Sequence, residues 1–295
     1  MTSLATDGST AYQGASAEAI QSHYDIGNEF YELWLDPTRT YSCALWDGPD
    51  DTLTDAQARK HDYLVEQTRA DRAKRVLDVG SGWGALLRRL VERHGVAEVV
   101  GLTLSQAQLD HVRGWADDRY ELRLENWIDH RPTAAYDAII SIGAFEHFAD
   151  MGMDRAERIA AYREFFRRCR EWLPPGGRLA VQTMVKGNNT RMSKQTVRDL
   201  LFMIDRIFPE SELPWSSELV EASERAFDIV SIRNDADHYA RTCLEWRRRL
   251  LADRDRAEAM VGGQAVDDYD RYLSAAASGF QNRHLGLARV IFERA

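Results

Sequence analysis

The chain has 295 residues, of which 44% are hydrophobic, and this length fits one core with additions. A formal net charge of −9 argues against nucleic-acid binding, because phosphates demand a basic face. Three scattered cysteines exclude a disulfide framework or metal cluster, and no apolar run approaches the ~18 residues that span a bilayer. With no leader-like segment, we expect a cytoplasmic protein without a metal or stable membrane association.

The first part of the chain divides into two predicted segments. Residues 1–16 are small and polar and are predicted to be disordered. Residues 17–73 show a helical pattern around an aromatic run, "HYDIGNEFYELWLDPTRTYSCALW", which begins at His23. Phe30 and Trp34 lie at helical spacing within it, and we expect them to pack against the core.

Residues 74–185 alternate between strand and helix patterns. Apolar bursts predict five strands, and amphipathic stretches predict helices between them. Units of this length predict a parallel sheet with helices on both faces, a doubly wound Rossmann-like α/β fold. The predicted strands are 74–80, 97–105, 120–127, 136–148 and 178–185, and the predicted helices are 85–95, 106–118 and 158–177.

The alternation breaks after Val185. Residues 186–225 lack a strand pattern and contain the Pro-punctuated "IFPESELPW", so we expect an inserted helical cap that shapes the substrate pocket. Residues 226–295 are expected to complete the sheet. Their pattern predicts strands at 227–235 and 285–294 and one helix at 238–260.

The glycine loop "LDVGSGWGA" follows the first strand of the core. Gly80, Gly82 and Ala85 satisfy a dinucleotide fingerprint, but that fingerprint also requires an acid about 20 residues later, where "GLTLS" offers none. The acid is Asp78 instead. Asp-x-Gly-x-Gly-x-Gly is typical of S-adenosylmethionine (SAM) methyltransferases, which predicts Asp78, Gly80 and Gly82 at the amino-acid end of SAM. The alternative is that these glycines only allow close helix–sheet packing.

Six motifs resemble the cyclopropane-fatty-acid synthase-like methyltransferases, which include the mycolic acid cyclopropane synthases. The aromatic run, "VLDVGSGWG", "GLTLSQAQ", "SIGAFEHF", "LPPGGRLAVQT" and "HYARTCLEW" occur in that family's order over about residues 20 to 250. The resemblance implies a class I methyltransferase with a helical N-terminal lid, residues 17–73, over its SAM pocket. It places at the cofactor Tyr24, Tyr41, Ser42, Thr103, Leu104, Gln108, Asn126, Trp127 and Ile142.

The resemblance also implies a set of catalytic residues. In the cyclopropane synthases a bicarbonate ion is held by the backbone of a cysteine, a glutamate, a tyrosine and a histidine. Cys43, Glu146 and Tyr239 match three of these, whereas Gln182 replaces the histidine. An amide has no titratable nitrogen near neutral pH, which argues against bicarbonate and against cyclopropanation.

Glu146 and His147 form an acid–imidazole pair at a strand end, where functional groups of parallel sheets gather. The alternative is that this pair only caps the next helix.

The leading hypothesis is a C-methyltransferase that acts on an alkene or other carbon nucleophile of a small hydrophobic metabolite, such as an isoprenoid, in secondary metabolism. A carbocation would then lose a proton or cyclise. The alternatives are an N-methyltransferase of an amine, cyclopropanation of an unsaturated acyl chain, and a non-catalytic SAM-binding protein. The sequence leaves a homo-oligomer open.

Overall fold

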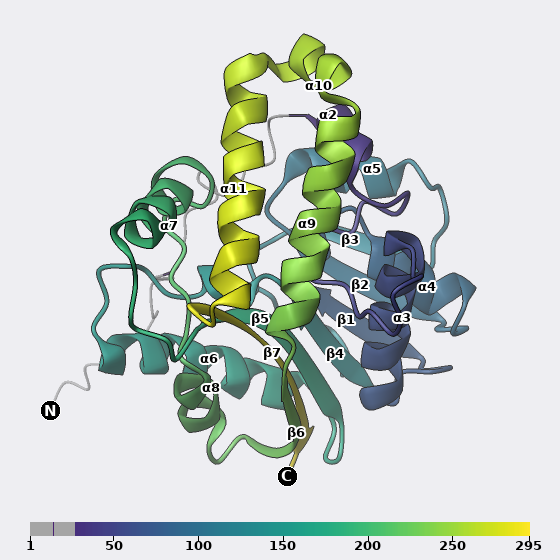
Figure 1. Ribbon diagram of the computed structural model, residues 1–295. Helices are drawn as coiled ribbons and strands as arrows, with labels where there is room; N and C mark the ends of the chain where they lie inside the picture. Colours follow the sequence, from purple (N-terminus) through teal and green to yellow (C-terminus); the bar gives the residue numbers. More distant parts are fainter. Residues whose placement is uncertain (1–13, 15–26) are drawn as a thin grey trace, which may run out of the picture.

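The computed structural model describes residue 14 and residues 27–295 (Figure 1). The predictions for Tyr24 and for most of residues 1–16 therefore lie outside the described residues. Seven strands form one sheet in the order β3-β2-β1-β4-β5-β7-β6. They are β1 (Arg75–Val79), β2 (Glu98–Thr103), β3 (Tyr120–Leu124), β4 (Ala138–Ile142), β5 (Arg178–Lys186), β6 (Phe227–Asn234) and β7 (Leu285–Arg294).

The sheet is mixed rather than wholly parallel. Strands β1 to β5 pair in parallel, whereas β7 runs antiparallel to both β5 and β6. The reason lies in the helices between β6 and β7, because α9 (Ala236–Ala252) and α11 (Gly263–Gln281) run away from the sheet and back again (Figure 1). The chain thus returns to the end of the sheet at which β6 stops. It then inserts β7 between β5 and β6, and β7 must run in the direction opposite to β6.

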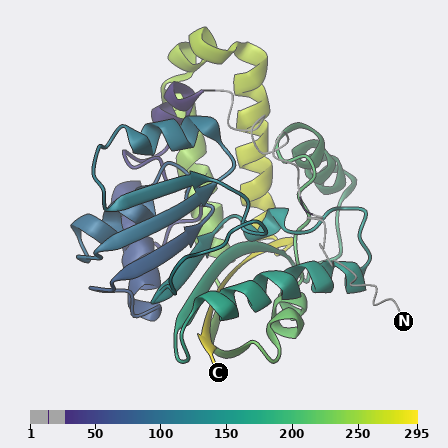
Figure 2. The same cartoon turned by 180° about the vertical axis from the view of Figure 1, so that it is seen from behind.

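Helices cover both faces of the sheet (Figures 1 and 2). On β4, Ala138 and Ile140 pack on one helical layer and Ile139 packs on the other, because successive side chains of a strand alternate between faces. The first layer contains α3 (Leu53–Gln67), α4 (Ala85–Glu92) and α5 (Gln106–Arg113), and the second contains α6 (Arg155–Trp172) and α8 (Ser216–Ser223).

A further hydrophobic cluster joins α2 (Asn28–Trp34), α7 (Lys194–Arg206), α9, α10 (Arg254–Val261) and α11. Phe30 and Trp34 are buried in it, as predicted. The single helix predicted at 238–260 is wrong, since the chain breaks at Asp253 between α9 and α10, and α11 was not predicted. No helix in the described part of the chain is long and apolar enough to cross a bilayer.

Candidate active site

Two adjoining cavities lie at the carboxyl ends of the parallel strands. The glycine-loop cavity, about 140 Å³, is lined by β1, β2, β4 and the loops that follow them. The helix-covered cavity, about 430 Å³, lies under α7, α9 and α11. Tyr41, Ser42, Gly143 and His147 line both, so the two spaces meet at these residues. A molecule bound in one cavity would therefore contact a molecule bound in the other at this junction.

The glycine loop turns β1 into α4 and leaves room for a ligand. Gly80 has a φ of +84°, and a Cβ there would meet the Ala144 Cβ at 2.6 Å, so this glycine is required by packing. Gly82 has a φ of +54°, and a Cβ there would meet nothing within 4 Å. Because Gly82 lines the cavity, its missing side chain lets a ligand approach the backbone.

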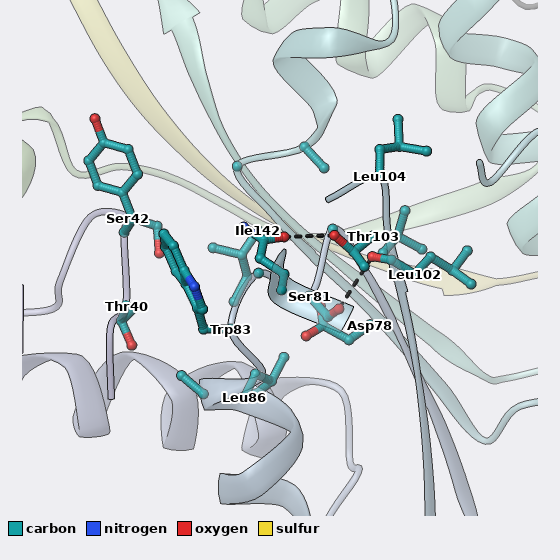
Figure 3. Close-up of a pocket in the computed structure, with 18 of the residues that line it drawn as sticks. Thr40, Ser42, Asp78, Ser81, Trp83, Leu86, Leu102, Thr103, Leu104 and Ile142 are labelled. Carbon is teal, nitrogen blue, oxygen red and sulfur yellow. Dashed lines mark hydrogen bonds between the residues drawn. The ribbon is translucent and has the colours of Figure 1, made fainter. Parts of the chain in front are cut away.

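Asp78 supplies an unused hydrogen-bond acceptor to the glycine-loop cavity (Figure 3). Its side chain is buried, and Oδ1 has no hydrogen-bond partner among the described residues. Burial raises the pKa of Asp78 to about 7, an effect that the nearby Lys60 cation opposes. A buried acceptor of this kind fits a ligand that carries an ammonium group, such as the amino-acid end of SAM.

The side of the glycine-loop cavity formed by the end of β2 and the start of α5 is polar. Thr103 Oγ1 donates to Gln108 Oε1 at 2.6 Å, which leaves the amide nitrogen of Gln108 for a ligand. Figure 3 shows Thr103 and Leu104 across the cavity from Ser42 and Trp83. Every predicted cofactor residue that the structure describes lines this cavity: Tyr41, Ser42, Asp78, Gly80, Gly82, Thr103, Leu104, Gln108, Asn126, Trp127 and Ile142.

Residues 40–44 form the wall between the two cavities. The Tyr41 ring packs 5.3 Å from Trp34 and 5.2 Å from Trp246, so this part of the wall is held by aromatic contacts. On the α3 side, Gln57 Nε2 donates to the Ser42 carbonyl at 2.8 Å. These contacts hold the wall segment against α2, α3 and α9.

Lys60 was not predicted, although it lines the glycine-loop cavity. Its ammonium group is fully buried and donates to Ser42 Oγ at 2.8 Å. Burial and, to a smaller extent, the Arg289 cation lower the pKa of Lys60 to about 7. The available signal was the spacing of Gln57, Lys60 and Leu64, which share the buried face of α3.

Glu146 lies in the 3₁₀ turn Phe145–His147 that follows β4, and it lines the helix-covered cavity. Its Oε1 accepts from the Met184 amide at 2.6 Å. Its buried Oε2 accepts no direct hydrogen bond from the described residues; the nearby Thr183 hydroxyl donates to the Met184 carbonyl at 3.0 Å and helps to lower the pKa of the Glu146 carboxyl. Burial raises the pKa of Glu146 to about 7, and the Met184 amide offsets this in part.

His147 lines both cavities, and its Nδ1 lies 3.0 Å from Ser211 Oγ. Burial lowers the pKa of His147 to about 4, so the imidazole is neutral at pH 7. The capping alternative for Glu146 and His147 is wrong, because Asp154 and Glu157 form the capping box of α6.

The remaining predicted catalytic residues are Tyr239, Gln182 and Cys43, and they do not all line a cavity. Tyr239 stacks on Phe280 at 4.5 Å, and both line the helix-covered cavity together with Gln182. Cys43 belongs to the wall segment but lines neither cavity, and its carbonyl accepts from Gln182 Nε2 at 3.3 Å. The rest of the cavity is largely apolar, with Leu200, Met203, Ile204, Ile207, Phe208, Leu285 and Leu287. Within the described residues, no cluster of three or more His, Cys, Asp or Glu side chains could hold a metal ion.

A family model described as mycolic acid cyclopropane synthetase matches residues 12–290. Cyclopropane mycolic acid synthase 2 of Mycobacterium leprae is 36% identical over 287 residues, which cover 90% of each chain. The solved structure of the cyclopropane synthase MmaA2 from Mycobacterium tuberculosis superposes with a TM-score of 0.87 and 30% identity, covering 95% of this chain and 99% of that one. The mycolic acid cyclopropane synthase CmaA1, complexed with SAH and CTAB, gives 0.86 and 31% over the same shares.

These matches confirm the predicted class I methyltransferase fold and SAM as the cofactor. The roles assigned above to individual residues stay predictions. The match spans nearly the whole chain at more than 30% identity, so this protein is a SAM-dependent methyltransferase that belongs to the mycolic acid cyclopropane synthetase family.

Proposed function

We propose that the enzyme adds a methyl group to a carbon–carbon double bond of a long unsaturated acyl lipid and closes a cyclopropane ring. The observation that carries this proposal is the large apolar cavity that meets the cofactor cavity beside Glu146. The similarity to cyclopropane mycolic acid synthases and to a structure with the amphiphile CTAB supports an acyl chain over a small metabolite. The proposal thus follows the cyclopropanation alternative of the sequence analysis.

Alignment is the first task of the chain. When bound, SAM supplies an electrophilic methyl group. Contact with the apolar side chains of the helix-covered cavity favours binding by roughly 25 cal/mol for each Å² of acyl surface that leaves water. Because Tyr41, Ser42 and His147 border both cavities, they place the double bond against the methyl, and such proximity supplies much of the rate.

Proton removal is the second task. As one alkene carbon bonds the methyl carbon, the methyl–sulfur bond would break with its electron pair left on the sulfur, and the neighbouring alkene carbon becomes a cation. A proton then leaves the new methyl group, and the freed C–H electron pair closes the three-membered ring. Glu146 Oε2 is the acceptor we assign to that proton, because it is buried without a hydrogen-bond partner among the described residues and its pKa lies near 7. The electron-rich faces of the Tyr239 and Phe280 rings attract positive charge and so stabilise the carbocation.

Deuterium counting tests the proposal. The enzyme is incubated with SAM bearing a CD₃ group and with oleoyl phospholipid, oleoyl thioester, terpenoid or amine acceptors. Ring closure retains two deuteriums on an oleoyl product. A product only from an amine or terpenoid acceptor would refute the lipid assignment.

A second candidate is methylation of the alkene without ring closure, which Gln182 favours. Its amide replaces the histidine that the family resemblance implies, and an amide takes up no proton near neutral pH. The cation would then lose a proton from a neighbouring carbon, and the product would keep three deuteriums. The same experiment therefore separates the two candidates.

A further inference from the structure

Arg289 is a fully buried cation on β7 that ties the walls of the helix-covered cavity together. It lies opposite Gln182 in the antiparallel register of β5 and β7, and its Nε donates to Gln182 Oε1 at 2.7 Å. Its Nη1 pairs with Asp235, which immediately precedes α9. Its Nη2 donates to the carbonyls of Cys43 at 3.3 Å and Ala44 at 3.0 Å. One guanidinium thus joins β5, the wall segment and the start of α9.

These contacts fix which end of the Gln182 amide faces which neighbour. An arginine Nε–H can only donate, so the atom of Gln182 that meets it must be the oxygen. The Cys43 carbonyl can only accept, so the atom that meets it must be the nitrogen. The two constraints agree, and a flipped amide would break both hydrogen bonds.

The orientation matters because Gln182 lines the helix-covered cavity. A carboxamide nitrogen carries two hydrogens, and Cys43 receives only one of them. Glu146 lines the same cavity, and it accepts from the backbone amide of Met184, two residues after Gln182 on β5. The oriented amide therefore directs its acceptor oxygen toward Arg289, which lines neither cavity, and its nitrogen keeps one hydrogen that Cys43 does not receive.

We propose that Arg289 is a positioning residue that holds the Gln182 amide with its oxygen withdrawn from the cavity, so that Glu146 is the acceptor beside the reacting cation. This inference rests on the carbocation chemistry of the proposed function. A flipped Gln182 would present a carbonyl oxygen to the cation, attract its positive charge and shift the carbon that loses the proton. Arg289 touches neither substrate nor cofactor in this assignment and acts through Gln182.

The test uses four variants of the full chain: Arg289→Lys, Gln182→Met, the double variant, and Arg75→Met as a control. Lysine keeps a cation for Asp235 but lacks the Nε–H that faces Gln182. Arg75 is also largely buried and pairs with Glu98 at 2.7 Å, but it lies at the amino end of β1, away from both cavities. Its loss should lower stability and leave the product unchanged.

Two readouts are measured on each variant. In protein labelled with ¹⁵N-glutamine, the Gln182 side-chain amide is assigned by its disappearance in Gln182→Met, and its hydrogen exchange should quicken at least ~10-fold in Arg289→Lys. With CD₃-labelled SAM and oleoyl phospholipid, the ratio of products with two and three deuteriums should shift by ~10-fold or more in Arg289→Lys, in which the Gln182 carbonyl is free to turn toward the cation. This ratio does not depend on how much enzyme is folded. The double variant should give the same ratio as Gln182→Met, because it has no Gln182 carbonyl for Arg289 to orient.

Unchanged amide exchange in Arg289→Lys would overturn the inference whether or not a lipid is methylated. A product ratio in the double variant that stays shifted relative to Gln182→Met would also overturn it, because Arg289 would then act without Gln182. If the amide loosens as expected while the wild type labels no lipid, the orientation by Arg289 is supported and the proposed function is the part that fails.

Discussion

Replacing Glu146 with glutamine should make the enzyme more stable and much less active. The amide oxygen of glutamine can still accept from the Met184 amide, which the carboxylate meets at 2.6 Å. The NH₂ group would replace the buried Oε2, which has no partner among the described residues. The substitution therefore removes a titratable group and keeps its anchoring hydrogen bond.

The expected gain in stability follows from the pKa of Glu146. Burial raises this pKa from 4.5 to about 7, so the folded protein holds a proton that the unfolded chain has lost between these pH values. Stability conferred by the native carboxyl is lost as pH rises through that window. The difference corresponds to roughly 3 kcal/mol. Glu146→Gln should thus gain up to about 3 kcal/mol above pH 7 and little below pH 4.5.

Activity should change in the opposite direction. Removing the proton acceptor should lower turnover by roughly 10²-fold or more, with SAM affinity near that of the wild type. Wild-type turnover should rise with pH through about 7 as Glu146 ionises. Denaturant unfolding at pH 5 and pH 8, calorimetric SAM titration and single-turnover assays measure these quantities. A variant with normal turnover, or one less stable than the wild type at pH 8, would refute the reasoning. Rescue of its turnover at pH 9 would instead favour the N-methyltransferase alternative.

Three further predictions concern the cofactor cavity and its surroundings. Gly82→Asp should abolish SAM binding in calorimetry, whereas Gly95→Asp, at a similar φ of +65° and with nothing within 4 Å of its Cβ, should bear the same backbone strain and bind normally. Amides of residues 28–46 should exchange more slowly with SAM bound if residues 17–73 form a lid; full protection without SAM would favour simple packing. Added bicarbonate should leave the rate unchanged, and a bicarbonate-dependent rate would show that Gln182 holds the anion.

The sequence by itself determined the features that depend on neighbouring residues. Strand β1, the glycine loop and α4 were predicted because apolar periodicity and glycine spacing act over a few residues. The predicted cofactor residues that the structure describes lie together because each lies at or soon after the carboxyl end of a strand or precedes the core, and parallel strands bring those ends to one edge.

Only the tertiary structure decided the charges and partners within the site. Adjacent Glu146 and His147 both have altered pKa values because packing removes water from them, and no local pattern reports burial. Arg289 and Gln182 are 107 residues apart in the sequence. They meet because α9 and α11 return the chain to the sheet, so that β7 pairs antiparallel with β5 and Arg289 lies opposite Gln182. A sequence pattern shows that a strand exists, but its direction and register follow from how the helices between strands pack.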